Sequence, residues 1–179
     1  MVKLDKHFYM EEKMKRIRNI LLSLTMLLVV ILSTACTREQ NTRTTGNTTT
    51  KVYVKEVRKG FNATVIYEYI ESEDKIIKHI SKTEGIYEYL PNMKNKEEAK
   101  NLLDPNGKKF EDIRGIKHSV EYQEDKFIDI LEIDYSNLDV EKAKSKGVIE
   151  KEFEDPSKVP VSMKKTEKQM IEWGYTEQK

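Results

Sequence analysis

Cysteine is almost absent from this sequence of 179 residues, which contains only Cys36. A lone cysteine excludes an intramolecular disulfide and a cysteine-based metal site, so the fold must rest on its hydrophobic core. His79 and His118 are the only histidines after Cys36, and neither has an HxH or HxxxH partner. This spacing favours structural or surface roles for both histidines over zinc binding.

A strong excess of charge of one sign is also missing, because 32 lysines and arginines face 31 aspartates and glutamates. Residues 1–35 contain six basic and three acidic side chains, which leaves 26 basic and 28 acidic ones from Cys36 onward. A slightly acidic remainder argues against sequence-independent binding of nucleic acid, which requires many cations to neutralise phosphates.

No uncharged apolar run is long enough to span a membrane comfortably. The longest, ILLSLTMLLVVIL, has 13 residues from Ile20 to Leu32 and as a helix would cover roughly 20 Å of a hydrocarbon core about 30 Å thick. Basic residues precede this run and small residues follow it, which is the order of an export signal. We therefore predict a signal peptide over residues 1–35, with a retained anchor helix as the alternative. The flanking residues are Lys15, Arg16, Arg18, Ser33, Thr34 and Ala35.

The sequence Leu32-Ser33-Thr34-Ala35 before Cys36 resembles a bacterial lipobox, although the leucine lies four rather than three residues before the cysteine. The resemblance implies that a diacylglyceryl group is attached to the Cys36 sulfur and that cleavage makes Cys36 the mature N-terminus. Two acyl chains would hold a soluble domain firmly on a bilayer. The alternative is a plain secretory signal with an incidental cysteine.

The segments on either side of the signal also fit export. Residues 1–13 contain three acidic side chains, unusual before an apolar run, whereas Met14 begins the more ordinary basic start MKRIRN. We therefore expect translation to start at Met14. After Cys36, residues 37–50 contain seven threonines and no aliphatic or aromatic side chain. We predict that residues 36–50 form a disordered tether for one domain over residues 51–179.

Within this domain, alternating apolar residues predict strands over 51–57, 61–70, 74–82, 115–123 and 127–135, with 84–90 extending the third. Helical spacing predicts a helix beginning after Asn95. Pro105 either breaks this helix or kinks one continuous helix, and Gly107 favours the break. A C-terminal helix is predicted between Ser162 and Gly174. A short helix is predicted within 137–147. The expected class is α+β, an antiparallel sheet of about five strands with two main helices packed on one face.

Three segments, NKEEAKNLLDP, FEDIRGIKHSVEYQEDKFIDILEIDYSNLD and VSMKKTEKQMIEWGYTE, resemble the corresponding helix, hairpin and closing helix of YehR-like bacterial lipoproteins, a family of unknown function. The resemblance covers most of residues 51–179. It implies export, lipidation and an α+β domain, and it supplies no catalytic residues and no cofactor.

Two groups of residues are candidates for a site. Tyrosine combines apolar area with a hydrogen-bonding tip, so a binding face is one interpretation of the strand tyrosines; the other is that they fill the core. These candidates are Tyr67, Tyr69, Tyr122 and Tyr135. The strand carboxylates Asp129, Glu132 and Asp134 could act as acid and base or bind calcium, but salt bridges to lysine are the commoner role. No Ser-His-Asp, GxSxG, P-loop or dinucleotide-binding motif is present.

Three classes of function follow. The leading one is a lipid-anchored, extracytoplasmic domain that is not an enzyme and binds an unknown ligand or envelope protein. The second is an enzyme that uses the strand carboxylates. The third is a precursor whose signal peptide is released as a signalling peptide.

Overall fold

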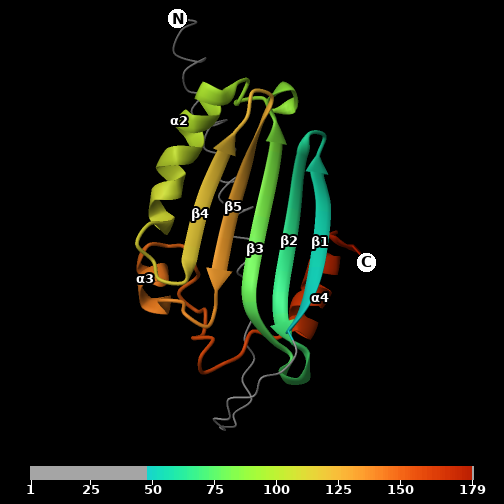
Figure 1. The fold of residues 1–179 in the computed structure, drawn as a ribbon, viewed down its shortest axis with the longest axis vertical. Helices are drawn as coiled ribbons and strands as arrows, with labels where there is room; N and C mark the ends of the chain where they lie inside the picture. The colour runs from blue at the N-terminus through green and yellow to red at the C-terminus, as the bar shows by residue number, and fades with distance from the viewer. Residues whose placement is uncertain (1–47, 179) are drawn as a thin grey trace, which may run out of the picture. The chain divides into compact units, whose positions relative to one another are not determined.

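The computed structural model describes residues 48–178, which form one antiparallel sheet covered by helices (Figure 1). The six strands lie in the order β4-β5-β3-β2-β1-β6. Their bounds are β1 Thr48–Arg58, β2 Phe61–Ile70, β3 Lys75–Ile86, β4 Ile116–Tyr122, β5 Lys126–Asp134 and β6 Thr176–Gln178. The α+β class and the antiparallel sheet are confirmed.

The strands form because apolar and polar residues alternate along them, which gives the sheet an inner and an outer face. In β2 the odd-numbered residues from Phe61 to Tyr69 are buried and the even-numbered ones are not. The register aligns Tyr67 with His79 of β3, His79 with Ile133 of β5, and Ile133 with Ile116 of β4. All four side chains are buried, so this row marks the inner face.

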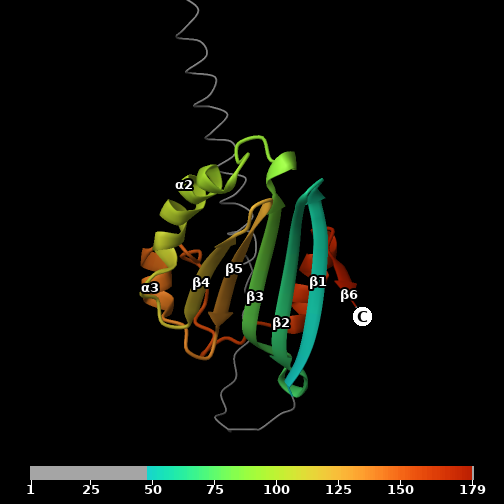
Figure 2. The same ribbon diagram turned by 45° about the horizontal axis from the view of Figure 1, so that its top comes forward.

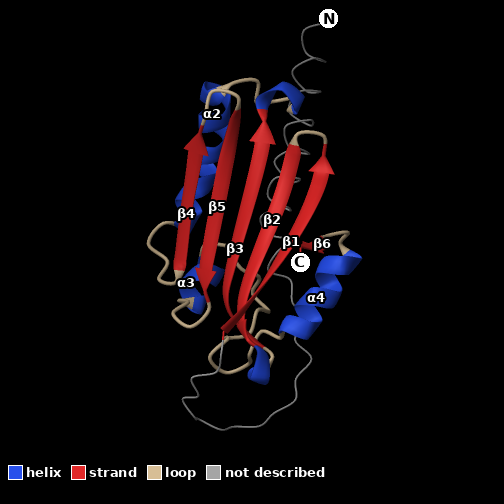
Figure 3. Cartoon of the chain, turned by 45° about the vertical axis from the view of Figure 1, so that its right-hand side comes forward, coloured by secondary structure: helices blue, strands red, loops and turns tan. Residues whose placement is uncertain are grey.

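The two main helices lie on this inner face (Figure 3). Helix α2, Lys96–Gly107, is capped by the Asn95 side chain, which accepts a hydrogen bond from the Glu98 N–H at 2.9 Å. It buries Ala99 and Leu103 over β4 and β5.

Helix α4, Met163–Glu172, is capped by Ser162 and buries Met163, Thr166 and Met170. Gly174, at φ 80°, then turns the chain back into β6. Four short helices complete the fold, namely η1 Glu71–Glu73, η2 Tyr87–Tyr89, η3 Lys108–Phe110 and α3 Val140–Ser145.

Four local features differ from expectation. The third strand does not extend to residue 90, because β3 ends at Ile86 and η2 follows at Tyr87–Tyr89. The predicted break at Pro105 is wrong, because α2 continues through Pro105 to Gly107. Pro105 removes one backbone hydrogen bond, and only two residues of the helix follow it. Strand β1 begins at Thr48, so the last three threonines of the segment predicted to be a tether belong to the sheet.

The sixth strand, β6, was not predicted. It has only three residues and pairs with Val52 to Val54 at the edge of β1 (Figure 2). Within residues 48–178, no helix is long and apolar enough to cross a membrane.

Candidate functional site

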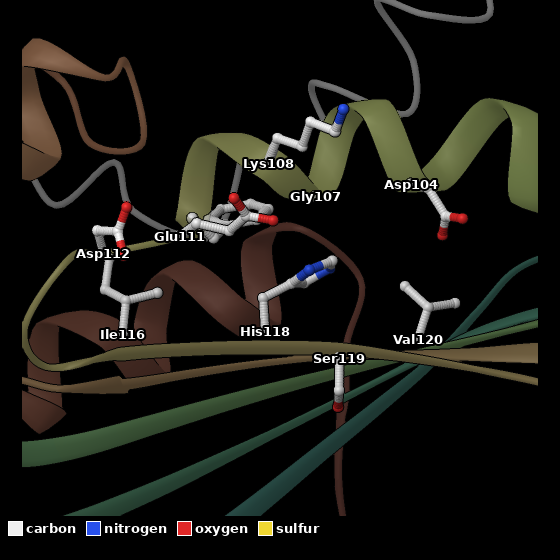
Figure 4. Close-up of a pocket in the computed structure, with 10 residues that line it drawn as sticks. Asp104, Gly107, Lys108, Glu111, Asp112, Ile116, His118, Ser119 and Val120 are labelled. Carbon is white, nitrogen blue, oxygen red and sulfur yellow. The ribbon is translucent and has the colours of Figure 1, made fainter.

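A pocket of about 390 Å³ lies between the C-terminal end of α2, the short helix η3 and strand β4 (Figure 4). The alternation of β4 sends Ile116, His118 and Val120 toward the helices, whereas Ser119 points to the other face of the sheet. The lining residues are Asp104, Gly107, Lys108, Phe110, Glu111, Asp112, Ile116, His118, Ser119 and Val120.

His118 lies in the middle of the pocket and is held by Asp129 of β5. Its Nε2 lies 2.9 Å from the Asp129 Oδ1, and the two side chains are only 12% and 16% exposed. The Phe110 ring packs on the imidazole with 4.7 Å between ring centroids. With Nε2–H donating to the Asp129 carboxylate, Nδ1 is the ring nitrogen left to accept a hydrogen bond.

Gly107 allows the end of α2 to approach this imidazole closely. A Cβ at position 107 would lie 2.9 Å from the His118 Cε1 and 3.0 Å from its Nδ1. Contacts this short exclude any larger residue unless the histidine moves, so Gly107 sets the height of the pocket above His118.

A second polar contact closes one end of the pocket. The Tyr122 hydroxyl donates to the Asp104 Oδ1 at 2.5 Å, linking β4 to α2. Burial and this hydrogen bond raise the pKa of Tyr122 above its usual range. Burial lowers the pKa of Lys109, an effect that the nearby Asp129 charge opposes.

The strand carboxylates do not converge on one site. Asp129 faces the helices beside His118, whereas Glu132 lies on the outer face with Lys78 and Lys117, at 3.3 and 3.4 Å. Asp134 accepts a hydrogen bond from the Ser136 N–H at the end of β5. Residues 48–178 contain no group of three or more histidine, cysteine, aspartate or glutamate side chains placed to hold a metal.

The four candidate tyrosines do not form an exposed face, so the interpretation that they fill the core is the better one for three of them. Tyr67, Tyr69 and Tyr135 are 2%, 7% and 5% exposed. The Tyr67 hydroxyl lies 3.6 Å from the Met170 sulfur of α4. Only Tyr122 lies beside the pocket. The proposed lipobox Leu32, Ser33, Thr34 and Ala35 and the lipid attachment site Cys36 lie outside the described residues.

The pairing of His118 with Asp129 was not predicted, although the signal was present. The alternation places His118 and Asp129 among the apolar-face residues of the two hairpin strands, and the observed register, with Val120 opposite Asp129, leaves His118 in the diagonal position beside the carboxylate. Asp104 and Phe110 had no comparable signal, because their approach to β4 depends on how α2 packs.

Comparison with known proteins gives the family. The family model described as "Protein of unknown function (DUF1307)" matches residues 49–176. The chain belongs to this family. It is 32% identical over 126 residues to an uncharacterized lipoprotein of Listeria innocua, Lin0239, covering 67% of the chain and 75% of the relative. It is 28% identical to the uncharacterized lipoprotein Lmo0207 of Listeria monocytogenes, covering 72% of the chain and 80% of that protein.

Two solved structures share the fold of this DUF1307 chain. The NMR structure of the E. coli YehR protein matches with a TM-score of 0.57 at 22% identity, covering 75% of this chain and 93% of YehR. An NMR structure of a Streptococcus pneumoniae TIGR4 protein matches with a TM-score of 0.51 at 17% identity, covering 83% of this chain and 95% of that one. The resemblance to YehR-like lipoproteins is thereby confirmed, and the family indicates no catalytic activity.

Proposed function

We propose that this DUF1307 protein is an exported lipoprotein, held on the extracytoplasmic face of the cell membrane through a diacylglyceryl group on Cys36. Residues 48–178 act there as a non-catalytic binding domain. The basic start, the apolar run and the lipobox-like residues before Cys36 support the anchor. The lipoprotein names of the two Listeria relatives agree with it.

The pocket between α2 and β4 is the proposed ligand site, and the main support for this proposal is the volume and lining of the pocket. Its volume of about 390 Å³ is in the range of small ligand pockets, and it combines the apolar side chains of Ile116, Phe110 and Val120 with the polar His118. An acceptor nitrogen fixed by Asp129 is suited to orienting a ligand by a hydrogen bond.

Binding fits this site better than covalent catalysis. Ser119 is next to His118 in sequence but points to the opposite face of the sheet, so His118 cannot activate its hydroxyl. The three strand carboxylates are divided between the two faces of the sheet. They therefore do not form the neighbouring acid and base that an enzyme using these carboxylates would need.

The anchor is tested by Cys36→Ser in the full chain, with Thr37→Ser as the matched control. Serine lacks the sulfur that carries the lipid, so we expect the Cys36→Ser protein to leave the membrane fraction while the control remains there. Fractionation followed by immunoblotting measures this. A Cys36→Ser protein that stays fully membrane-bound would show that an uncleaved helix is the anchor.

The ligand site is tested by titrating peptides, glycans and lipids into the protein and following amide NMR signals. We expect a ligand to shift the signals around His118 and to bind at least about tenfold more weakly to Val120→Phe, which fills the pocket. Lys117→Arg, on the outer face of the same strand and outside the pocket lining, is the control and should bind normally. No binding by any member of a broad panel would contradict the proposed function.

A further inference from the structure

The pocket lies beside β4, which is an edge strand of the sheet. His118 and Val120 point their side chains into the cavity, whereas Ser119, which also borders it, points its side chain to the other face of the sheet. Strand β4 is the last strand on this side of the sheet and pairs only with β5.

The backbone groups of alternate β4 residues point away from β5, toward the free edge of the sheet. The Gly115 C=O accepts from the Asp134 N–H at 2.7 Å, and the Gln123 N–H donates to the Lys126 C=O at 2.8 Å. The backbone N–H and C=O groups of odd-numbered β4 residues therefore point to β5. Those of the even-numbered residues His118 and Val120 point to the free edge. Among the described residues, the backbone partner that reaches this edge is the Ile113 C=O, which accepts from the Ile116 N–H.

The charge around the cavity indicates which side chain would enter it. Asp104, Glu111 and Asp112 contribute three carboxylates to the lining, against the ammonium of Lys108. The Lys109 ammonium lies over the Phe110 ring, near the Asp129 carboxylate. His118 is already paired with Asp129. A ligand group that enters below α2 therefore meets more negative than positive charge, which favours a cation.

From these two observations we propose that β4 captures an extended peptide as an additional antiparallel strand, with a lysine or arginine of that peptide entering the pocket. This inference rests on the proposed function and names its partner class. The peptide residues that face the pocket are those that exchange hydrogen bonds with His118 and Val120, because directly opposed residues of antiparallel strands point to the same face.

Val120→Pro tests the edge in the full-length, lipidated protein in detergent micelles. The Val120 N–H points away from β5, so proline removes the donor that a peptide needs without removing a hydrogen bond of the sheet. Lys117→Arg, on the outer face of the same strand and outside the pocket, is the control. The probe is the peptide TKTKTKT, with acetylated and amidated ends. We expect it to bind Val120→Pro at least about tenfold more weakly than wild type and to bind the control normally.

Two changes to the probe test pairing and charge on the wild-type protein, and they still apply if Val120→Pro does not fold. N-methylation of the lysines should abolish binding, because their N–H groups face β4, whereas N-methylation of the threonines should leave it intact. TETETET should bind at least about tenfold more weakly than TKTKTKT, because its carboxylates would meet those of the pocket.

Each contrary result is decisive. Equal binding to a folded Val120→Pro protein, or equal binding of TETETET, would overturn the inference. A wild-type dimer that Val120→Pro dissociates would show that a second copy of the chain occupies the edge instead. If no peptide binds but a glycan or lipid shifts the His118 signals, the proposed function stands and the peptide inference fails. If nothing binds, both fail.

Discussion

His79 places an ionisable ring in the centre of the core. Its side chain is fully buried and stacks on Tyr67 with 5.1 Å between ring centroids. Neither ring nitrogen has a hydrogen-bond partner among the described residues. Burial lowers the pKa of His79 from 6.5 to about 4, because the charged ring would lose its hydration. The expectation of a structural role for this histidine agrees with its position.

His79 should make the protein sensitive to mild acid. Between pH 6.5 and 4 the unfolded chain binds a proton that the folded chain does not, so the free energy of unfolding decreases as the pH falls. The loss should reach about 3 kcal/mol near pH 4. Urea denaturation of wild type and His79→Leu at several pH values measures it. The variant retains the carboxylates and His118, so their contributions cancel in the comparison. Parallel pH profiles would contradict the prediction.

At the scale of elements, Asp74 joins the β2–β3 connection to the start of α4. Its carboxylate accepts from the Ser162 hydroxyl at 2.5 Å and from the Lys164 N–H at 2.9 Å, and its C=O accepts from the Met163 N–H at 3.2 Å. These bonds satisfy N–H groups that have no partner within the helix. A negative charge is also favourable at a helix N-terminus.

Removing the Asp74 carboxylate should destabilise the start of α4. We expect Asp74→Ala to reduce the free energy of unfolding by about 1–2 kcal/mol, through the lost cap and through the left-handed backbone at φ 50°, which alanine tolerates poorly. Asp74→Asn keeps an acceptor oxygen and tolerates this backbone, so it should lose less. Urea denaturation compares them. The exposed Glu71→Ala is the control, and an Asp74→Ala protein as stable as this control would refute the role of the cap.

The elements that the sequence predicts well are those with a repeating local pattern. The bounds of β2 agree with the prediction at both ends, because its alternation is unbroken and Gly60 turns the chain before it. β6 has only three residues, too few for a pattern, and depends on β1 for its hydrogen bonds. Which tyrosines are covered depends on where α4 packs, and this long-range contact is not encoded in the strand pattern.

At the scale of the whole described domain, the core lies on one side of the sheet. The outer face carries charged residues that pair with one another: Lys78 lies 3.3 Å from Glu132 and 4.0 Å from Glu68, and Lys126 lies 3.4 Å from Glu84. Isoleucines such as Ile130 lie between these pairs and are only partly buried. A sheet of this kind gains most of its hydrophobic stabilisation from the helix-covered face.

Two isoleucines of β5 allow a direct test of this asymmetry. Ile133 is on the inner face and is 0% exposed, whereas Ile130 is on the outer face and partly exposed. We expect Ile133→Ala to reduce the free energy of unfolding by about 3 kcal/mol, because it leaves a cavity under the helices, and Ile130→Ala to reduce it by about 1 kcal/mol. Both replacements remove the same atoms from the same strand, so the loss of strand propensity is shared. Urea denaturation gives both values, and equal losses would mean that the outer face is covered as thoroughly as the inner one.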